Sequence, residues 1–196
     1  MYKLVVCNIG EFSEAQYDDE YAKLTDTDKN RIDKLKSNDS KHRTLAGRML
    51  ARKAVAQLTC CDGDKLEFCI DDRGKPYIKD SEVFFSISHC DEWVVCAASS
   101  KPIGADIERI RPVSVKFAKR VCTENELKYV VDENVAFDIL DDRLTEKFFE
   151  VWTLKEAYFK LIGTGITDLK SIDTLSDIPH KYTQRMNEYL ISVVTE

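Results

Sequence analysis

The chain has 196 residues, of which 43% are hydrophobic and 33% charged, and these ordinary globular values exclude global disorder and fibrous classes. Its formal net charge of -6 argues against a protein that mainly coats nucleic acid, because such proteins are usually basic. The 7 cysteines form no C-x-x-C pair and no apolar run approaches a membrane span, so we expect reduced thiols, a cytoplasmic protein and no membrane partner.

Capping residues and hydrophobic periodicity predict the elements of the first half of the chain. Residues 2–9 are typical of a strand, and Thr25 with Asp28 opens a helix to about residue 36. Asp39 or Ser40 then caps a long helix to about residue 58. The β-rich runs that follow predict strands at 66–70, 83–88 and 93–98. A turn is expected at 71–76 and a hairpin turn at 89–92.

The second half repeats this layout. A strand is expected at 103–110, and Thr123 with Glu126 has the spacing of a capping box for a short helix. A long helix runs from about residue 145 to 162 and stops at Gly163, and residues 190–194 form a closing strand. Each half therefore has a long helix followed by β segments that end in an apolar strand, which indicates a faint duplication in layout.

The strand at 103–110 carries two carboxylates on one face. Asp106 and Glu108 point the same way, whereas Ile103, Ala105 and Ile107 point the other way. Gly104 is expected to leave the acidic face open. Paired carboxylates repel each other unless a cation lies between them, and Mg²⁺ usually takes one or two carboxylates together with substrate phosphates. The alternative is a solvated edge strand with alternating acids.

The helical segment 148–160 is apolar almost all round, so we expect it to be buried. Lys155 falls on an apolar side, and Glu156 and Lys160 lie one turn apart beside Trp152. Buried charges cost free energy unless they are paired or bound to a metal or ligand. The pattern fits either a ligand site or a surface Glu–Lys pair worth about 0.2–0.5 kcal/mol, and the residues alone leave both open.

Two further groups of polar residues could contact phosphate. Ser88 and His89 end an apolar run, where hydroxyl, imidazole and backbone N–H groups suit a phosphate, although a lone turn histidine is also a common surface residue. The basic residues of the first long helix and the turn after it either meet solvent or line a polyphosphate pocket; they are Arg43, Arg48, Arg52 and Lys75.

Five segments, taken together and in order, carry a resemblance that none carries alone. They are His42-Arg43-Thr44, Gly74-Lys75-Pro76, Ser86-Ile87-Ser88-His89, Gly104-Ala105-Asp106-Ile107-Glu108 and Trp152-Thr153-Leu154-Lys155-Glu156-Ala157-Tyr158-Phe159-Lys160. In this order they resemble the 4'-phosphopantetheinyl transferases, in the longer, two-lobed class. The match spans most of the chain, and its last two motifs are the hallmark of that family.

The resemblance implies an α+β fold of two similar lobes, residues 1–102 and 103–196, related by a pseudo-two-fold axis with coenzyme A in the cleft between them. It implies Mg²⁺-dependent transfer of the 4'-phosphopantetheine arm of coenzyme A to a serine of an acyl or peptidyl carrier protein. Adenosine 3',5'-bisphosphate would be released. A monomer is expected because both halves of the cleft occur in one chain.

The resemblance also implies roles for individual residues. Asp106, Glu108 and Glu156 would hold Mg²⁺ against the pyrophosphate. Glu156 would take the serine proton, directly or through a metal-bound water, and Lys160 would stabilise the leaving phosphate. Coenzyme A would be bound by a wider set, namely Arg43, Thr44, Lys75, Ser88, His89, Asp106, Lys155 and Lys160. Near its start the sequence departs from the family pattern, and either Lys29 or Arg31 would contact the ligand.

A basic segment after the acidic motif is a candidate docking surface for the carrier protein, which in this family's reactions is typically acidic around its serine. The residues concerned are Arg111, Lys116, Phe117, Lys119 and Arg120, with Arg109, Val113, Val115 and Val121 among them. The alternative is a helix whose basic face meets water and whose apolar residues are core.

Two other functions compete with the transferase. A non-catalytic module that binds coenzyme A or a nucleotide would not need Glu156 and Lys160. A different magnesium enzyme acting on phosphoesters, such as a nuclease, is disfavoured by the net charge of -6, and no nucleic-acid partner is expected.

Overall fold

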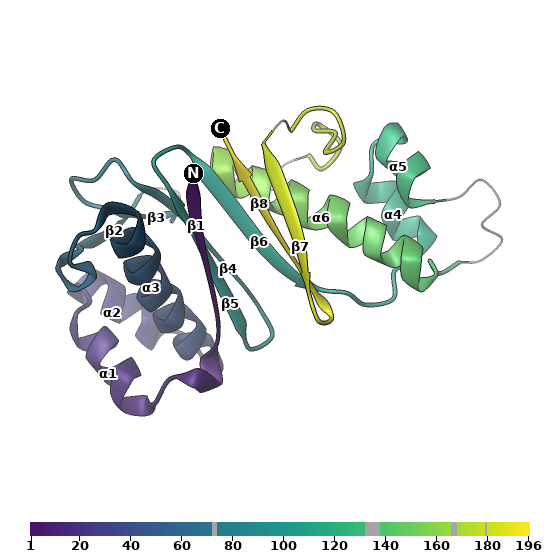
Figure 1. Ribbon diagram of the computed structural model, residues 1–196. Helices are drawn as coiled ribbons and strands as arrows, with labels where there is room; N and C mark the ends of the chain where they lie inside the picture. The colour runs from purple at the N-terminus through teal and green to yellow at the C-terminus, as the bar shows by residue number, and fades with distance from the viewer. Residues whose placement is uncertain (72–73, 132–137, 166–167, 179) are drawn as a thin grey trace. The chain divides into compact units, whose positions relative to one another are not determined.

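The computed structural model describes residues 1–71, 74–131, 138–165, 168–178 and 180–196. The chain divides into two compact units, Met1–Ile103 and Gly104–Glu196. Each unit combines helices with a three-stranded sheet, so the expected mixed α+β fold is confirmed (Figure 1). The pseudo-two-fold axis and the cleft stay predictions, and part of the expected turn at 71–76 lies outside the described residues.

The first unit places one long helix on an antiparallel sheet. The sheet has the order β1-β5-β4 and consists of β1 (Tyr2–Asn8), β4 (Phe84–Cys90) and β5 (Trp93–Ser99). Helix α3 (Asn38–Thr59) packs so closely on this sheet that a Cβ at Gly47 would lie 2.9 Å from Cγ2 of Ile87. The other elements are η1 (Ile9–Glu11), α1 (Glu14–Ala22), α2 (Asp26–Asp33), η2 (Gly63–Lys65), β2 (Phe68–Ile70) and β3 (Pro76–Ile78).

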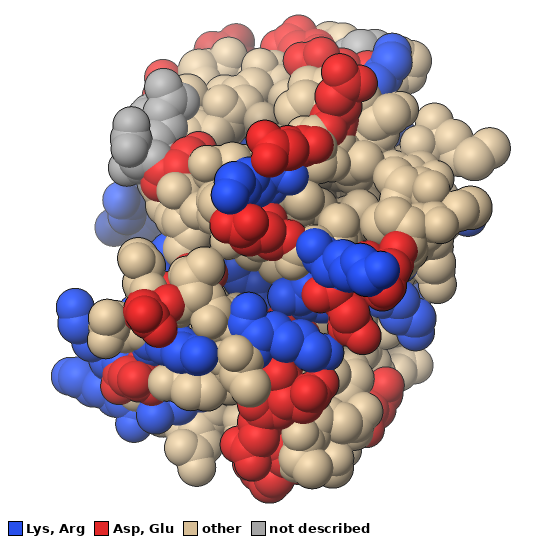
Figure 2. Space-filling view, turned by 90° about the vertical axis from the view of Figure 1, so that its left-hand side faces the viewer, with Lys and Arg blue, Asp and Glu red and all other residues tan. Residues whose placement is uncertain are grey.

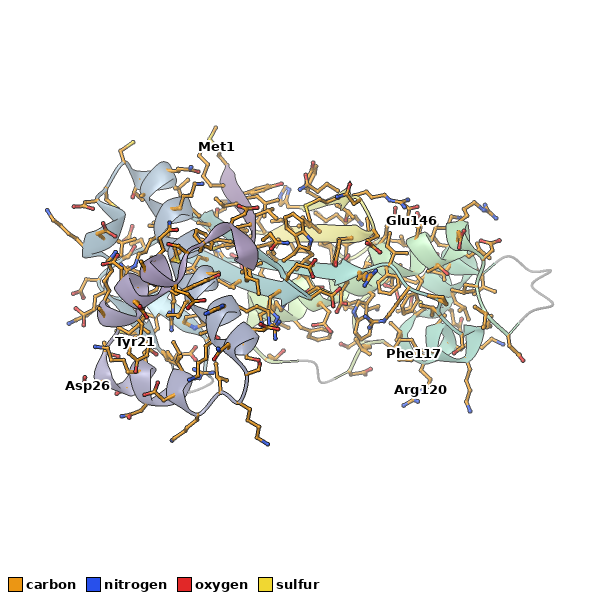
Figure 3. All side chains as sticks on the ribbon, turned by 90° about the horizontal axis from the view of Figure 1, so that it is seen from below. Met1, Tyr21, Asp26, Phe117, Arg120 and Glu146 are labelled. Atoms are coloured by element: carbon orange, nitrogen blue, oxygen red, sulfur yellow. The ribbon has the colours of Figure 1, made fainter. Side chains whose placement is uncertain are left out.

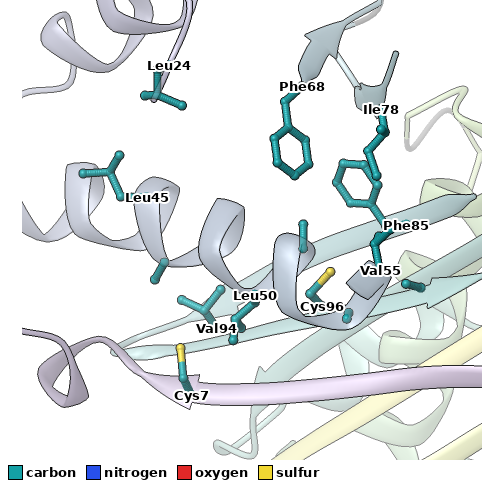
Figure 4. Packing of buried hydrophobic residues seen from close by; sticks show 14 of the residues in the cluster. Cys7, Leu24, Leu45, Leu50, Val55, Phe68, Ile78, Phe85, Val94 and Cys96 are labelled. Atoms are coloured by element: carbon teal, nitrogen blue, oxygen red, sulfur yellow. The ribbon is translucent and has the colours of Figure 1, made fainter. Parts of the chain in front are cut away.

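The core of the first unit lies between α3 and its sheet (Figure 4). Leu50 points from α3 toward β5, where Val94 and Cys96 lie, whereas Leu45 lies on the other side of the helix, toward Leu24 (Figure 4); all five residues are buried. Gly47 and Ala54 are buried as well and, with Leu50, recur every three or four positions, which is the spacing of one helix face. This apolar face holds α3 on the sheet.

The second unit has the same plan. Its sheet has the order β6-β8-β7 and consists of β6 (Ile103–Arg109), β7 (Lys181–Met186) and β8 (Tyr189–Thr195). The long helix α6 (Asp142–Ile162) packs on this sheet, and the short helices α4 (Val115–Val121) and α5 (Glu124–Val130) join it (Figure 1). In both units one strand precedes the long helix, and a hairpin of two strands follows it. The second strand of the hairpin pairs with the first strand of the unit, so the duplication in layout extends to sheet topology.

Several helix and strand ends differ from the expected positions. Helix α3 is capped by Ser37, whose hydroxyl accepts from the N–H of Ser40, and not by Asp39 or Ser40. His89 lies inside β4, because the hairpin turn is confined to residues 91–92, with Asp91 at φ +50°. Helix α6 ends where expected, at Gly163 with φ +71°, but begins at Asp142, because Asp141 caps it.

Helix α1 and strands β3 and β7 are among the elements that were not predicted. Helix α1 is capped by Ser13, which forms with Gln16 a capping box that the sequence displays, whereas β3 has only three residues and β7 is mostly polar. All 7 cysteines are free thiols, as expected. In the part of the chain that the structure describes, no helix has both the length and the apolar character needed to cross a membrane.

Candidate active site

A close approach of β6 to α6 builds the acidic part of the site. A Cβ at Gly104 would lie 1.8 Å from the carbonyl oxygen of Ala157, so only glycine permits this contact. The expectation of an open face at Gly104 was wrong, because the backbone of α6 occupies it. The contact brings Asp106 and Glu108 against the part of α6 that carries the motif at residues 152–160.

Both β6 carboxylates make direct contacts with α6. Nζ of Lys160 donates to Oδ1 of Asp106 at 2.6 Å, and Nε1 of Trp152 donates to Oε1 of Glu108 at 3.2 Å. Asp106 is only 3% exposed, so the alternative of a solvated edge strand fails. Lys160 reaches across to the sheet, which also argues against a simple surface pair between Glu156 and Lys160. The Trp152–Glu108 bond was not foreseen from the sequence.

The three carboxylates affect one another's protonation. Burial, together with the charges of Asp106 and Glu108, raises the pKa of Glu156 to about 7, although Lys160 opposes this shift. Burial and Asp106 likewise raise the pKa of Glu108, while the hydrogen bond from Trp152 lowers it. A carboxyl group that titrates near neutral pH is suited to accept and release a proton.

The chemistry of these donors fits Mg²⁺. Carboxylate oxygens are the hard ligands that this ion prefers. The charges of Asp106 and Glu108 repel the carboxylate of Glu156 and raise its pKa, and a bound cation would relieve this repulsion. Among the described residues no group of three or more His, Cys, Asp or Glu side chains is already gathered tightly enough to hold an ion. A looser set of carboxylates still suits Mg²⁺, because this ion is commonly bound by one or two carboxylates together with phosphate and water.

Lys155 does not fit the phosphate contact that the resemblance implies. Its side chain is 0% exposed, and Nζ lies 2.8 Å from Oε2 of Glu126. The same nitrogen donates at 2.5 Å to the carbonyl oxygens of Leu169 and Ile172, so its three donors are used. This lysine is a buried structural group, and Glu126, its partner on α5, was predicted only as a capping residue.

A second group of predicted residues lines a cavity of about 370 Å³ in the first unit, between α2, α3, β4 and the start of β3. Arg43, Thr44 and His89 all line it, and Arg31 does so as well. Lys29 instead donates to the carbonyl oxygen of Ala22 at 3.3 Å, so Arg31 is the better candidate of the two for ligand contact.

Lys75 and Ser88 lie near this cavity but are not among the residues that line it. Gly74 and Pro76, on either side of Lys75, do line it, and burial lowers the pKa of Lys75 itself. Ser88 is buried at 6% exposure, and along β4 it alternates with the cavity-lining His89. Contacts of these two side chains with a ligand stay predictions.

Comparison with known proteins places both units in one family. A family model described as the 4'-phosphopantetheinyl transferase superfamily matches residues 102–192. A second, described as 4'-phosphopantetheinyl transferase, N-terminal, matches residues 11–101. The chain belongs to the 4'-phosphopantetheinyl transferase superfamily. The two matches meet at the boundary between the two units, as expected for the two-lobed class of this superfamily.

Curated relatives agree with this membership. The chain is 40% identical over 125 residues to the 4'-phosphopantetheinyl transferase gsp of Aneurinibacillus migulanus, covering 64% of this chain and 50% of the relative. It is 35% identical over 127 residues to the 4'-phosphopantetheinyl transferase Sfp of Bacillus subtilis, covering 64% and 54%. The chain thus spans about half the length of these relatives.

A solved structure matches part of the chain. It is a holo-(acyl-carrier-protein) synthase from Bacillus anthracis in complex with coenzyme A, with 25% identity and a TM-score of 0.41. The match covers 50% of this chain and 91% of that one.

Proposed function

We propose that this protein transfers the 4'-phosphopantetheine arm of coenzyme A to a serine of an acyl or peptidyl carrier protein. The observation that carries the proposal is the group of Asp106, Glu108, Glu156 and Lys160 held together by β6 and α6 in a member of the 4'-phosphopantetheinyl transferase superfamily. A module that only bound coenzyme A would not need three mutually repelling carboxylates beside a lysine.

In the proposed reaction the serine hydroxyl oxygen attacks the β-phosphorus of coenzyme A. A new P–O bond forms to serine, and the bond from that phosphorus to the bridging oxygen breaks, releasing adenosine 3',5'-bisphosphate. Glu156 accepts the serine proton, which its pKa of about 7 permits near neutral pH. Lys160 is held on Asp106 at 2.6 Å, where its ammonium group would offset the charge of the leaving phosphate.

Asp106, Glu108 and Glu156 are the residues that would hold Mg²⁺, which when bound would neutralise the pyrophosphate and orient it. Trp152 fixes the position of Glu108 through its indole N–H. In the first unit, Arg43, Thr44 and His89 line a cavity whose charge would suit the adenosine phosphate, with Lys75 and Ser88 as further candidates.

The carrier protein would dock on α4. Lys116, Lys119 and Arg120 are exposed there, and Phe117 is 42% exposed beside them; Figure 3 shows Phe117 and Arg120 on this helix. A cavity of about 410 Å³ adjoins Phe117 and is lined by Arg111 and Trp152 among others. An acidic carrier helix with an apolar residue at its centre would match this combination. Val121 is buried in the core, whereas Val113, also buried, lines the cavity beside Phe117.

Arg109 is a poor candidate for the same surface, because it forms an ion pair with Glu188 at 2.7 Å. A nuclease is also disfavoured, since basic and acidic side chains are interleaved over the face in Figure 2 and the net charge is -6. Broad phosphate-backbone binding needs a continuous basic surface.

One assay tests the proposal. The protein is incubated with coenzyme A, Mg²⁺ and an apo carrier protein, and the carrier is weighed by mass spectrometry. A gain of one phosphopantetheine is expected with the wild type, and loss of that gain is expected with Asp106→Asn. Glu188→Gln, which alters an exposed carboxylate, should keep the activity and is the matched control. Tight coenzyme A binding without transfer would support the binding module instead.

The docking surface is tested separately by charge reversal. Lys116→Glu with Lys119→Glu should raise the KM for the carrier and leave the affinity for coenzyme A unchanged. Lys128→Glu with Lys170→Glu changes the net charge equally at exposed positions of the same unit and should leave the KM unchanged. An unaltered carrier KM in the first variant would place the docking surface elsewhere.

A further inference from the structure

Two buried arginines of α3 occupy almost equivalent positions but differ in one respect. Arg48 and Arg52 lie one turn apart, and their guanidinium carbons lie 5.0 and 4.9 Å from the ring centroid of Phe68. Their side chains are 7% and 8% exposed. Each has a carboxylate partner from a neighbouring helix, Asp28 for Arg48 and Glu20 for Arg52.

Arg52 has close acceptors for both Nε and Nη1. Its Nε donates to both carboxylate oxygens of Glu20 at 3.0 and 3.1 Å. Its Nη1 donates to the carbonyl oxygens of Gly63 at 2.9 Å and Leu66 at 2.7 Å. The charge of Arg52 is therefore offset within the protein, and the residue ties α3 to α1 and to the segment around η2.

Arg48 is not satisfied in the same way. Its Nη2 makes only long contacts with Asp28, at 3.4 and 3.5 Å, and its buried Nη1 has no hydrogen-bond partner among the residues that the structure describes. A buried guanidinium N–H without an acceptor costs free energy, so such a group indicates a missing acceptor.

The surroundings of Arg48 indicate what that acceptor is. Arg48 lines the cavity of about 370 Å³ together with Arg31, Arg43 and His89, and among the described residues that line it Asp28 is the acidic one. Apolar side chains complete the wall, including Ile32 and Ile87. An excess of cations next to an apolar wall fits a nucleotide that carries a phosphomonoester, because the base needs apolar contact and the dianion needs cations.

We propose that Arg48 is a further ligand-binding residue, which makes this cavity specific for a nucleotide with a phosphomonoester group. The identification of that nucleotide as the adenosine part of coenzyme A rests on the proposed function. Nη1 of Arg48 donates to a phosphomonoester oxygen. Asp28, 4% exposed, keeps the guanidinium in place and offsets part of its charge while the cavity holds no anion.

Calorimetry with coenzyme A and with its 3'-dephospho form tests this role, using the whole protein and two pairs of variants. Arg48→Gln should weaken binding of coenzyme A by about 10- to 100-fold, the value of a charge-assisted contact, and change binding of the dephospho form less than threefold. Arg48→Lys, which keeps the charge but loses the fork, should restore part of the preference. Arg52→Gln and Arg52→Lys are the matched controls and should leave the ratio of the two affinities unchanged.

The outcomes separate the two proposals. If the wild type transfers the arm and the folded Arg48 variants keep its preference for coenzyme A, Arg48 has no such role and the proposed function stands. If Arg52→Gln alters the ratio as strongly as Arg48→Gln, the effect is structural and the inference is overturned.

If the wild type neither transfers the arm nor binds coenzyme A, the proposed function fails. Adenosine 3'-phosphate, which carries the phosphomonoester, and adenosine, which does not, then replace the two ligands. A preference for adenosine 3'-phosphate over adenosine that Arg48→Gln abolishes would support the role of Arg48, and binding of neither ligand would overturn it. Thermal melts run alongside confirm that each variant is folded at the temperature of the titration.

Discussion

Replacing Lys155 with methionine should destabilise the second unit strongly and leave the affinity of the folded protein for coenzyme A unchanged. Both Lys155 and Glu126 are 0% exposed, and they are 2.8 Å apart. The methionine would leave the carboxylate of Glu126 buried without its cation, although the N–H groups of Thr123 and Thr174 would still donate to it. Removing one partner from a buried ion pair typically costs about 3–5 kcal/mol.

That loss is large against the ~5–15 kcal/mol that holds a typical domain folded. With a shift of about 2–8 °C per kcal/mol, depending on the size of the unfolding unit, the Tm should fall by at least about 6 °C. Adding Glu126→Gln to Lys155→Met should restore part of the stability, because the double variant buries no unpaired charge. Arg185→Met breaks an exposed pair with Glu146 in the same unit and should cost less than about 1 kcal/mol.

Denaturant unfolding followed by circular dichroism measures the stabilities, and calorimetry below the Tm measures the affinity for coenzyme A. The reasoning is refuted if Lys155→Met leaves the Tm within about 2 °C of the wild type. A selective loss of coenzyme A affinity with unchanged stability would point instead to the phosphate contact that the family resemblance implies.

Three further changes test the junction of β6 and α6. Gly104→Ala should cost about 3 kcal/mol or more, measured by denaturant unfolding, because its Cβ would lie 1.8 Å from the backbone oxygen of Ala157; a stability equal to the wild type would disprove the close approach. Glu156 keeps its proton up to a pKa of about 7 in the folded protein but loses it near 4.5 when unfolded, so without Mg²⁺ the stability of the wild type should fall between pH 4.5 and 7. Glu156→Gln should remove that fall in unfolding experiments at the two pH values, and an identical slope in both proteins would reject the shift. Trp152→Phe removes the N–H that lowers the pKa of Glu108, so the acidic limb of the pH–rate profile should move to higher pH; an unmoved profile would mean that this bond does not tune the site.

Elements specified by nearby residues were predictable from the sequence. Thr123 with Glu126, and Gly163 after α6, mark helix ends through bonds and angles that involve only neighbouring residues. Likewise, the alternation along β6 was enough to place Asp106 and Glu108 on one face. Short polar strands such as β7 carry no such signal, because their partner strand, and not their own composition, keeps them extended.

The residue types of the candidate site were also visible in the sequence, but their roles depend on partners distant in the chain. Arg48 and Arg52 look alike on one helix face, yet only Arg52 finds enough acceptors, because α1 and the segment around η2 close over it. Lys155 and Lys160 are both lysines of one motif, and only packing against α5 turns the first into a buried structural group.

The sequence by itself determined that each half has one long helix followed by strands and that acidic and basic residues lie at the positions of a family motif, and the family resemblance implied the α+β fold. These properties follow from local periodicity, capping and residue chemistry, which act over a few positions. The tertiary structure alone decided that the backbone of α6 fills the space beside Gly104, that Arg31 and not Lys29 lines the cavity, and that Asp106 is paired with Lys160. The physical reason is that burial and electrostatic pairing depend on which segments pack together, and the cost or gain of a charge is set by those neighbours.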